Sequence, residues 1–144
     1  MANPIIKTDS HSDSELRTFF ALKNIAVIGM SKNEEMPSNF VPKYLVERGY
    51  NVIPVNPTAT EVMGRKSYQS IVEIPDLIDI VDVFRKPEDV PAIVTEAVKK
   101  SGIKVIWMQE GIYSEEAEAK AKENGMDVVS NRCMRAEHIR LFDE

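Results

Sequence analysis

The loop after the first apolar run of the chain carries residue types that bind phosphate groups. Gly29 comes directly after residues 25–28, and Ser31 and Lys32 come next. A glycine lets the backbone pass close to a ligand, and a hydroxyl and the free amides at a helix start can bind phosphate oxygens. The lysine adds a positive charge. The loop therefore predicts an anion site, with an ordinary strand-to-helix turn as the alternative.

This loop does not match the standard nucleotide motifs. In the fingerprint G-x-G-x-x-G, the second and third glycines would stand where this chain has Ser31 and Glu34. The carboxylate that binds the ribose of NAD at the end of a second strand is replaced by Asn56. The P-loop pattern G-x-x-x-x-G-K-[ST] does not occur in the sequence. A typical NAD site and ATP hydrolysis are therefore both disfavoured.

The elements around the loop alternate between strand-like and helix-like patterns. Runs rich in valine and isoleucine occur at residues 25–28, 52–55, 78–84, 105–108 and 127–130. Nearly continuous apolar strands are typical of a parallel sheet that helices cover on both faces. We predict an α/β fold: a Rossmann-like three-layer sandwich with a five-stranded parallel sheet in the order 3-2-1-4-5.

The N-terminal region divides into an arm and the first helix. Ser12 stands three residues before Glu15, which is the pattern of a capping box and predicts a helix over residues 13–22. We expect residues 1–11 to form a flexible arm and residues 12–144 to form one domain, since a chain of 144 residues has the usual length of a single domain.

Further signals mark the ends of the later helices. Gly49, Gly102 and Gly125 each precede a predicted strand and stand where a helix would end in a left-handed conformation. Ser114 is followed by two glutamates and has the features of a helix N-cap. A last helix is predicted over residues 135–142.

Polar side chains gather at the carboxyl ends of the predicted strands. They are Ser31 and Lys32 after the first strand, Asn56 after the second, Arg85 and Lys86 after the third, Gln109 after the fourth, and Asn131 and Arg132 after the fifth. The carboxyl ends of parallel strands meet at one edge of the sheet, where α/β proteins bind their ligands. We therefore predict a ligand site at this edge, beside the first strand.

Patterns for catalysis and for metal binding are sparse. His11 lies in the predicted arm, and His138 lies in the last helix, where a surface or packed position is expected. Glu110 stands at a strand end and is a candidate acid or base, although a solvated loop carboxylate is the usual case. The sequence contains no H-x-H, H-E-x-x-H or EF-hand pattern. We predict no catalytic residue and no metal ligand.

Composition limits the class of partner and the location. The chain has 18 basic and 23 acidic residues and a net charge of -5, which argues against binding to a nucleic-acid backbone. Cys133 is the single cysteine, so an intramolecular disulfide and a paired-cysteine zinc site are excluded. No apolar segment has the length of a signal peptide or a membrane span. We expect a soluble cytoplasmic protein without nucleic-acid or membrane partners.

Several motifs together resemble a known family. They are IAVIGMS, YLVERGYNVIPVNP, VMGRKSYQSI, IDIVDVFRKPEDVP, VIWMQEGI and MDVVSNRCMRAEH, in this order over residues 25–138. The chain resembles the stand-alone CoA-binding domain proteins, which are single-domain relatives of the N-terminal domain of the succinyl-CoA synthetase α subunit. The combination of VNP, FRKP and WMQEG is far more specific than a single glycine loop.

The resemblance implies a Rossmann-like domain that binds coenzyme A. It implies that the CoA phosphates meet residues 29–32, that the nucleotide and pantetheine parts follow residues 56–57 and 84–87, and that the far end approaches residues 109–111. The cofactor-binding residues predicted in this way are Gly29, Met30, Ser31, Lys32, Asn39, Asn56, Pro57, Phe84, Arg85, Lys86, Pro87, Gln109 and Gly111. The family often has a smaller residue at Met30, so this side chain would narrow the groove or point into the core.

The resemblance carries over ligand binding but not ligase activity, because the synthetase places its phosphorylated histidine in a second domain. We therefore predict a protein that binds coenzyme A or acyl-CoA without catalysis, as a carrier, sensor or regulator. Two alternatives stay open: a nucleotide-dependent oxidoreductase with a degenerate NAD site, and a module that binds a protein partner. The preference between free and acylated CoA and the state of self-association are open as well.

Cys133 lies just past the fifth predicted strand and has two interpretations. A thiol at the edge of the site could form a mixed disulfide with CoA, and a helix N-terminus would lower its pKa and make it more reactive. A lone cysteine before a helix is also typical of a small buried apolar residue.

Overall fold

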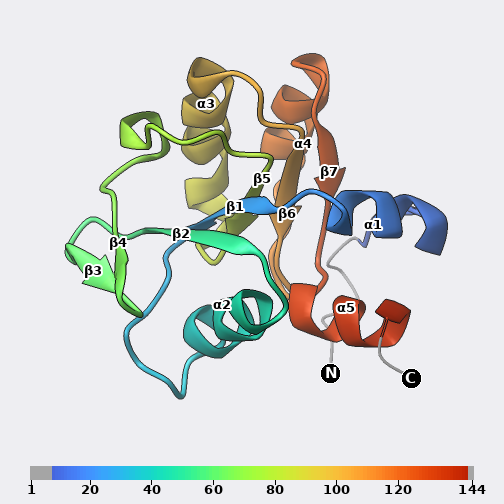
Figure 1. Cartoon of the computed structure of the whole chain (residues 1–144). Coiled ribbons are helices and arrows are strands. Elements are labelled where there is room, and N and C mark those ends of the chain that lie inside the picture. Colours follow the sequence, from blue (N-terminus) through green and yellow to red (C-terminus); the bar gives the residue numbers. More distant parts are fainter. Residues whose placement is uncertain (1–7, 143–144) are drawn as a thin grey trace.

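The computed structural model describes residues 8–142 and contains a central sheet of parallel strands (Figure 1). The strands are β1 (Asn24–Ile28), β2 (Asn51–Val55), β5 (Ile80–Val83), β6 (Val105–Met108) and β7 (Asp127–Val129). They lie in the order β2-β1-β5-β6-β7. The predictions of an α/β fold and of a five-stranded parallel sheet are therefore confirmed.

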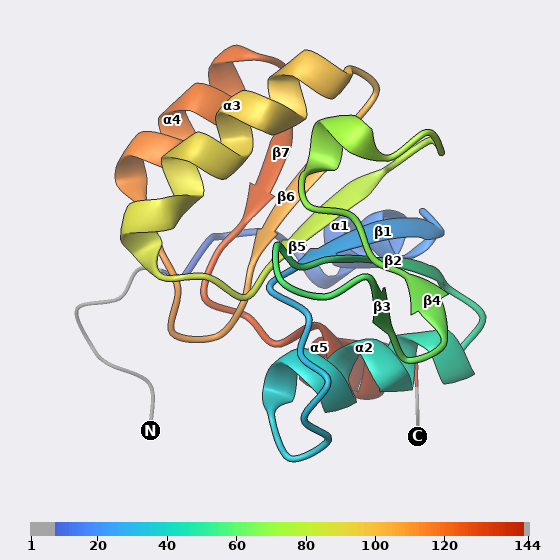
Figure 2. The same ribbon diagram turned by 90° about the vertical axis from the view of Figure 1, so that its left-hand side faces the viewer.

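Helices cover both faces of this sheet. They are α1 (Asp13–Phe20), α2 (Pro37–Glu47), α3 (Val90–Lys100), α4 (Glu115–Glu123) and α5 (Met134–Phe142). α3 and α4 pack together on one face, and α2 and α5 lie on the other (Figure 2). One apolar core lies under α3 and α4, and a second core, which includes buried side chains of α1, lies under α2 and α5. Within residues 8–142, no helix combines the length and the hydropathy needed to cross a membrane.

The predicted strand order, 3-2-1-4-5, is wrong at one position. The third long strand, β5, pairs with β1 on the side opposite β2, so the long strands follow the order 2-1-3-4-5. Between β2 and β5 the chain forms a small hairpin of β3 (Glu61–Val62) and β4 (Arg65–Lys66) and a 3-10 turn, η1 (Ile71–Glu73).

The handedness of the connections explains this order. The connection from β1 to β2 runs through α2 on one face, whereas the connection from β2 to β5 runs through η1, which packs against α3 on the other face. Because parallel crossovers are right-handed, a connection over the opposite face moves the chain in the opposite direction across the sheet. The switch point therefore lies between β1 and β5, which is where a ligand site is expected.

The helix ends follow the signals in the sequence. Ser12 Oγ accepts a hydrogen bond from the Glu15 amide at 3.1 Å, and the Glu15 carboxylate accepts one from the Ser12 amide at 2.9 Å. Ser114 Oγ accepts a hydrogen bond from the Ala117 amide at 3.1 Å. Gly49 follows α2 with a φ of 91°, the left-handed conformation predicted for it. The capping box, the later N-cap and this helix end are therefore confirmed.

Part of the predicted arm contacts the domain. Residues 1–7 lie outside the described residues, but residues 8–11 run along the end of β7. The Asp9 carboxylate accepts hydrogen bonds from the Arg132 guanidinium at 3.1 Å and from the Ser130 amide at 2.8 Å. This part of the arm is therefore held against the sheet. The division of the chain into an arm of residues 1–11 and a domain of residues 12–144 stays a prediction.

Candidate functional site

Gly29 brings the ends of β1 and β5 together at the switch point. Its φ is 85°, and its amide donates to the carbonyl of Val55 at 2.9 Å. A Cβ at this position would lie 3.0 Å from the carbonyl oxygen of Phe84 and 3.1 Å from Cδ of Arg85. Both the backbone conformation and the close approach of β5 therefore require glycine.

The loop after Gly29 is fixed to the start of α2. The Ser31 amide donates to the carbonyl of Ser38 at 3.1 Å, and the Asn39 side-chain amide donates to the carbonyl of Ser31 at 2.8 Å. Ser31 Oγ accepts a hydrogen bond from the Asn33 amide at 3.0 Å. The predicted residue Asn39 is buried, and its contact shows that it shapes the loop.

Asn56 links the ends of the first two strands. Its side-chain amide donates to the carbonyl of Met30 at 2.9 Å, and its side-chain oxygen accepts hydrogen bonds from the amide and the hydroxyl of Thr58, each at 2.9 Å. The side chain that stands in place of a ribose-binding carboxylate therefore joins two loops.

The end of β5 contributes an aromatic ring and positive charge. Phe84 is partly buried, and Arg85 is exposed and forms an ion pair with Asp89 at 3.2 Å. Lys86 is exposed and Pro87 is partly buried, and Pro87 begins the 3-10 turn η2 (Pro87–Asp89). Phe84 and Arg85 face the hollows described next, whereas Lys86 and Pro87 do not line them.

Three hollows follow the carboxyl edge of the sheet. The central groove has a volume of about 610 Å³, and the predicted site residues that line it are Gly29, Ser31, Lys32, Asn56, Pro57, Phe84 and Arg85. The inner pocket, of about 170 Å³, lies toward η1 and α3 and is lined in part by Val55, Gln69, Ser70, Ile71 and Ile93. The apolar pocket, of about 380 Å³, lies toward β6 and is lined by Met36, Pro37, Ser38, Phe40, Val41, Phe84, Gln109, Glu110, Ile112 and Cys133.

Shared walls join these hollows into one row. Gly29 and Arg85 line both the inner pocket and the central groove. Met36, Ser38 and Phe84 line both the central groove and the apolar pocket. The row therefore crosses the switch point and extends over the ends of β2, β1, β5 and β6.

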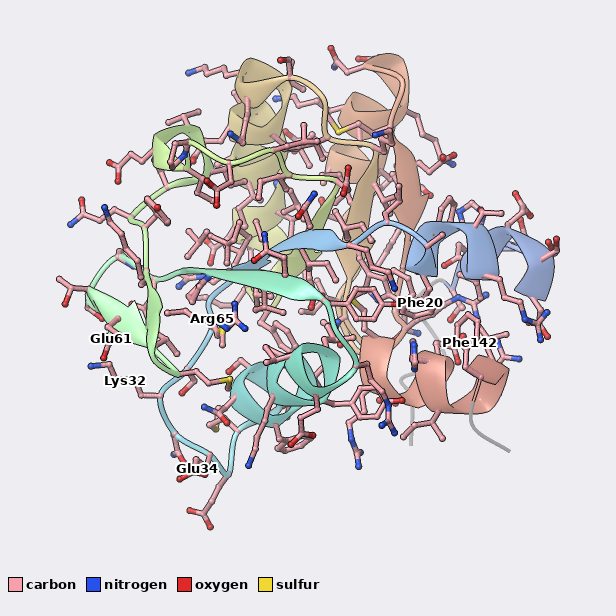
Figure 3. The ribbon with its side chains drawn as sticks, viewed as in Figure 1. Phe20, Lys32, Glu34, Glu61, Arg65 and Phe142 are labelled. Carbon is pink, nitrogen blue, oxygen red and sulfur yellow. The ribbon has the colours of Figure 1, made fainter. Side chains whose placement is uncertain are left out.

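Lys32 also borders a side pocket next to the central groove. The side chain extends from the loop toward the hairpin side of the molecule, where Glu61 lies, while Glu34 stands at the tip of the loop (Figure 3). Asn39 and Lys43 of α2 complete the lining from the helix side. Two lysines and two carboxylates therefore surround this pocket.

Met30 and Gly111, like Lys86 and Pro87, lie outside these three hollows. Met30 has an exposed fraction of 0% and packs in the core under α2 and α5, so of the two orientations expected for it the one toward the core is observed. The Gly111 amide donates to the side-chain oxygen of Asn131 at 2.6 Å. Gly111 therefore links the loops after β6 and β7.

Asp82 and Gln109 form a buried pair beneath the apolar pocket. The Gln109 amide donates to one carboxyl oxygen of Asp82, and the other carboxyl oxygen has no hydrogen-bond partner among the described residues. Burial raises the pKa of Asp82 to about 7, although the hydrogen bond from Gln109 lowers it. The sequence interpretation did not single out Asp82; the signal was a carboxylate inside an otherwise apolar strand.

Cys133 lies in the wall of the apolar pocket and is partly buried. Burial raises the pKa of its thiol, and this effect outweighs the hydrogen bonds from the amides of Ala136 and Arg135, which lower the pKa. The amides at the helix start therefore act in the expected direction, but the net pKa of the thiol is raised because burial disfavours the thiolate more strongly.

Neither of the other two catalytic candidates, His138 and Glu110, lies inside the row of hollows in a position typical of a general acid or base. His138 is buried, and its Nδ1 lies 2.8 Å from the hydroxyl of Tyr44, with the ring of Phe20 packed edge-on. It is therefore packed, which is one of the two positions expected for it. Glu110 is exposed at the rim of the apolar pocket. Across residues 8–142, no group of three or more His, Cys, Asp or Glu side chains is arranged to hold a metal ion.

The sheet and the row of hollows define the class: an α/β protein with a ligand groove at the switch point of a parallel sheet. Comparison with known proteins narrows this class, because residues 23–139 match the family described as CoA binding domain. The chain belongs to this family. The resemblance seen in the motifs is therefore confirmed, and the roles of individual site residues stay predictions.

Relatives at the sequence level include an uncharacterised protein and CoA ligases. YneT of Bacillus subtilis strain 168, an uncharacterised protein, is 40% identical over 116 residues, which are 81% of this chain and 85% of YneT. The ADP-forming acetate–CoA ligase II of Archaeoglobus fulgidus is 34% identical over 110 residues. That match covers 75% of this chain but 16% of the ligase. The chain thus spans a small part of the length of the ligase.

Solved structures show the same fold over nearly the whole chain. A hypothetical protein from Pyrococcus horikoshii OT3 is 46% identical, with a TM-score of 0.89, over 98% of this chain and 97% of the other. A Thermus thermophilus structure, cell-free ID.343, is 38% identical, with a TM-score of 0.87, over 92% of this chain and 100% of the other.

Proposed function

We propose that the chain binds coenzyme A, free or acylated, along the row of hollows and acts as a carrier, sensor or regulator without catalysis of its own. The observation that carries the proposal is the continuity of the inner pocket, the central groove and the apolar pocket across the switch point. Coenzyme A is a long ligand with a nucleotide at one end and a thiol at the other, and such a row offers a polar middle and an apolar end.

The central groove suits the phosphates. Ser31, Lys32 and Arg85 bring a hydroxyl and two positive charges to it. The ion pair between Arg85 and Asp89 is exposed to solvent, and exposed pairs are weak, so the guanidinium can exchange this partner for a phosphate. The start of α2 reaches the groove at Ser38 and adds the positive end of a helix dipole.

The inner pocket suits the nucleotide base. Val55, Ile71 and Ile93 form apolar walls, and Gln69 and Ser70 place polar groups beside them. A purine ring has apolar faces and hydrogen-bonding edges, which match this combination. Because the inner pocket shares walls with the central groove, a base there would lie next to the phosphates.

The apolar pocket would then receive the pantetheine arm and its thiol. Phe84 separates the central groove from this pocket and lines both of them. Gln109 and Cys133 lie at the far side. In this orientation, the ligand runs from β2 toward β6.

One observation favours this proposal over an NAD-dependent oxidoreductase. The Asn56 amide joins two loops where an NAD site would have a ribose-binding carboxylate. The chain covers only 16% of the Archaeoglobus fulgidus ligase, so the activity of that enzyme is not carried over. A cytoplasmic location stays a prediction.

Isothermal titration calorimetry of the reduced protein with CoA, acetyl-CoA, NAD and ATP tests the proposal. We expect CoA or acetyl-CoA to bind and NAD and ATP to give no comparable heat. Ser31→Glu should abolish CoA binding, because a carboxylate in the central groove repels the phosphates. Ser14→Glu adds the same charge at an exposed position of α1 and should leave CoA binding unchanged.

Other outcomes would contradict the proposal. Heat from NAD without heat from CoA would support the oxidoreductase. The absence of binding heat with all four ligands would support a module that binds a protein partner. Equal loss of CoA binding in the Ser31→Glu and Ser14→Glu variants would show that the ligand does not meet the Gly29 loop.

A further inference from the structure

The apolar pocket exposes large side chains at the β6 end of the row. Met36 and Phe40 have exposed fractions of 47% and 40%, although both are large apolar residues. Phe84 and Ile112 add partly buried apolar surface to the same pocket. Apolar surface gathered in one hollow marks a binding site more often than apolar residues scattered singly.

A free thiol covers little of this surface. If coenzyme A lies as proposed above, its sulfur enters the pocket past Phe84, and a chain bonded to that sulfur would extend toward Phe40 and Ile112. The pocket volume of about 380 Å³ leaves room beyond the sulfur for several carbon atoms. The pocket therefore has both the chemistry and the space for a short aliphatic group.

The charges around the pocket limit what that group can be. Among the described residues that line the pocket, none is a lysine or an arginine, and the charged side chain at its rim is the carboxylate of Glu110. The carboxyl group of Asp82 lies beneath Gln109. An acyl chain that ends in a carboxylate would meet the carboxylate of Glu110 at the rim and would find no cation in the lining to pair with.

We infer that this chain binds an acyl-CoA with a short, uncharged aliphatic acyl group, and that the apolar pocket is the acyl-binding site. The inference rests on the proposed function, because it depends on the thiol end of coenzyme A reaching Phe84. It specifies which thioesters of coenzyme A are bound. Neutral acyl chains of about four carbons are preferred, and dicarboxylic chains of equal length are excluded.

Butyryl-CoA and succinyl-CoA make a matched pair of probes, because both acyl groups have four carbons and only one ends in a carboxylate. Calorimetry with the reduced protein should show that butyryl-CoA binds at least about tenfold more tightly than CoA, since each fully buried methylene contributes about fourfold in affinity. Succinyl-CoA should bind no more tightly than CoA. The thioether S-butyl-CoA should also bind more tightly than CoA, which separates binding from acyl transfer to a protein thiol.

Variants connect this preference to the pocket. Phe40→Ser should reduce the affinity ratio of butyryl-CoA to CoA to about one. Leu77→Ser removes an apolar side chain that is 60% exposed elsewhere on the molecule and should leave the ratio unchanged. A ratio that stays high in Phe40→Ser would overturn the assignment of the pocket, provided that this variant keeps the thermal midpoint of the parent protein.

Failure of this inference differs from failure of the proposed function. If CoA binds but butyryl-CoA binds equally or more weakly, or if succinyl-CoA binds most tightly, the acyl site is refuted and the CoA site stands. If neither CoA nor any of its thioesters binds, the proposed function fails as well.

Discussion

Asp82 and Gln109 share a hydrogen bond that solvent does not reach: the Gln109 side-chain amide donates to a carboxyl oxygen of Asp82, and their exposed fractions are 0% and 4%. Asp82 lies in the middle of the sheet, between Val27 of β1 and Trp107 of β6. Gln109 also lines the apolar pocket. A titratable group in the core is thus in direct contact with the candidate site.

This pair predicts a pH-dependent stability. Burial raises the pKa of Asp82 to about 7 in the folded protein, whereas an unfolded chain releases this proton near the ordinary aspartate pKa of 3.8. Between these values the folded state holds a proton that the unfolded state has lost. The free energy of unfolding therefore falls as the pH rises, by about 1.4 kcal/mol per pH unit from this group, and the fall ends above the folded pKa.

Asp82→Asn should remove that dependence, because an amide keeps the acceptor for Gln109 and carries no charge at any pH. In urea unfolding between pH 5 and 8, we expect the stability of the variant relative to the parent protein to increase up to about pH 7 and then level off. Asp76→Asn changes an exposed carboxyl group and serves as the control. Parallel stability curves for Asp82→Asn and the parent protein would contradict the prediction.

Gly29 should tolerate no side chain. Gly29→Ala adds a Cβ that lies 3.0 Å from the Phe84 carbonyl oxygen, at a φ of 85°, so we expect a loss of roughly 1–3 kcal/mol in unfolding free energy and weaker CoA binding. Gly49 has a similar φ of 91°, but nothing lies close to a Cβ placed there. Gly49→Ala should therefore lower the unfolding free energy only by the cost of the left-handed backbone conformation, about 1 kcal/mol. Equal losses for the two variants in urea unfolding would show that the contact with β5 is unimportant.

Cys133 should react slowly as a thiol. Burial raises its pKa, so the thiolate fraction at neutral pH is smaller than in a solvated cysteine. We expect the rate of alkylation by iodoacetamide to reach its midpoint at a higher pH in the folded protein than in the same protein unfolded in urea. A lower midpoint in the folded protein would show that the amides at the start of α5 outweigh burial, and would favour a reactive thiol.

The contact between Asp9 and Arg132 should stabilise the fold, because it fastens residues 8–11 to the end of β7. The side chain of Asp9 is 6% exposed, so Asp9→Asn removes a buried charge-assisted contact and should cost roughly 1–3 kcal/mol, although Arg132 keeps its ion pair with Glu137 at 2.6 Å. Asp13 pairs with Arg140 at the surface, and Asp13→Asn should cost much less than Asp9→Asn. Urea unfolding of both variants measures the difference, and a loss no larger for Asp9→Asn would mean that the arm contributes little.

Much of the local structure was predictable from neighbouring residues. The capping box of Ser12 and Glu15, the N-cap Ser114 and the five apolar runs each depend on interactions within a few positions along the chain. The glycine at position 29 was predicted to let the backbone pass close to a ligand, whereas the close approach that the structure shows is to Phe84 and Arg85. Such signals give the fold class, the elements and the edge of the sheet where the candidate site lies, because hydrophobic periodicity and capping are local properties.

The remaining features arise from contacts between residues that are far apart in the chain. The place of β5 beside β1 depends on which face the connection through η1 crosses, and the sequence signals did not include that choice. The pairing of Asp82 with Gln109 joins two strands, and the raised pKa of Cys133 depends on how deeply packing buries the thiol. The apolar pocket likewise forms only where α2, β5 and β6 meet. Burial and proximity are properties of the packed chain, so these features follow from the packing and not from local sequence patterns.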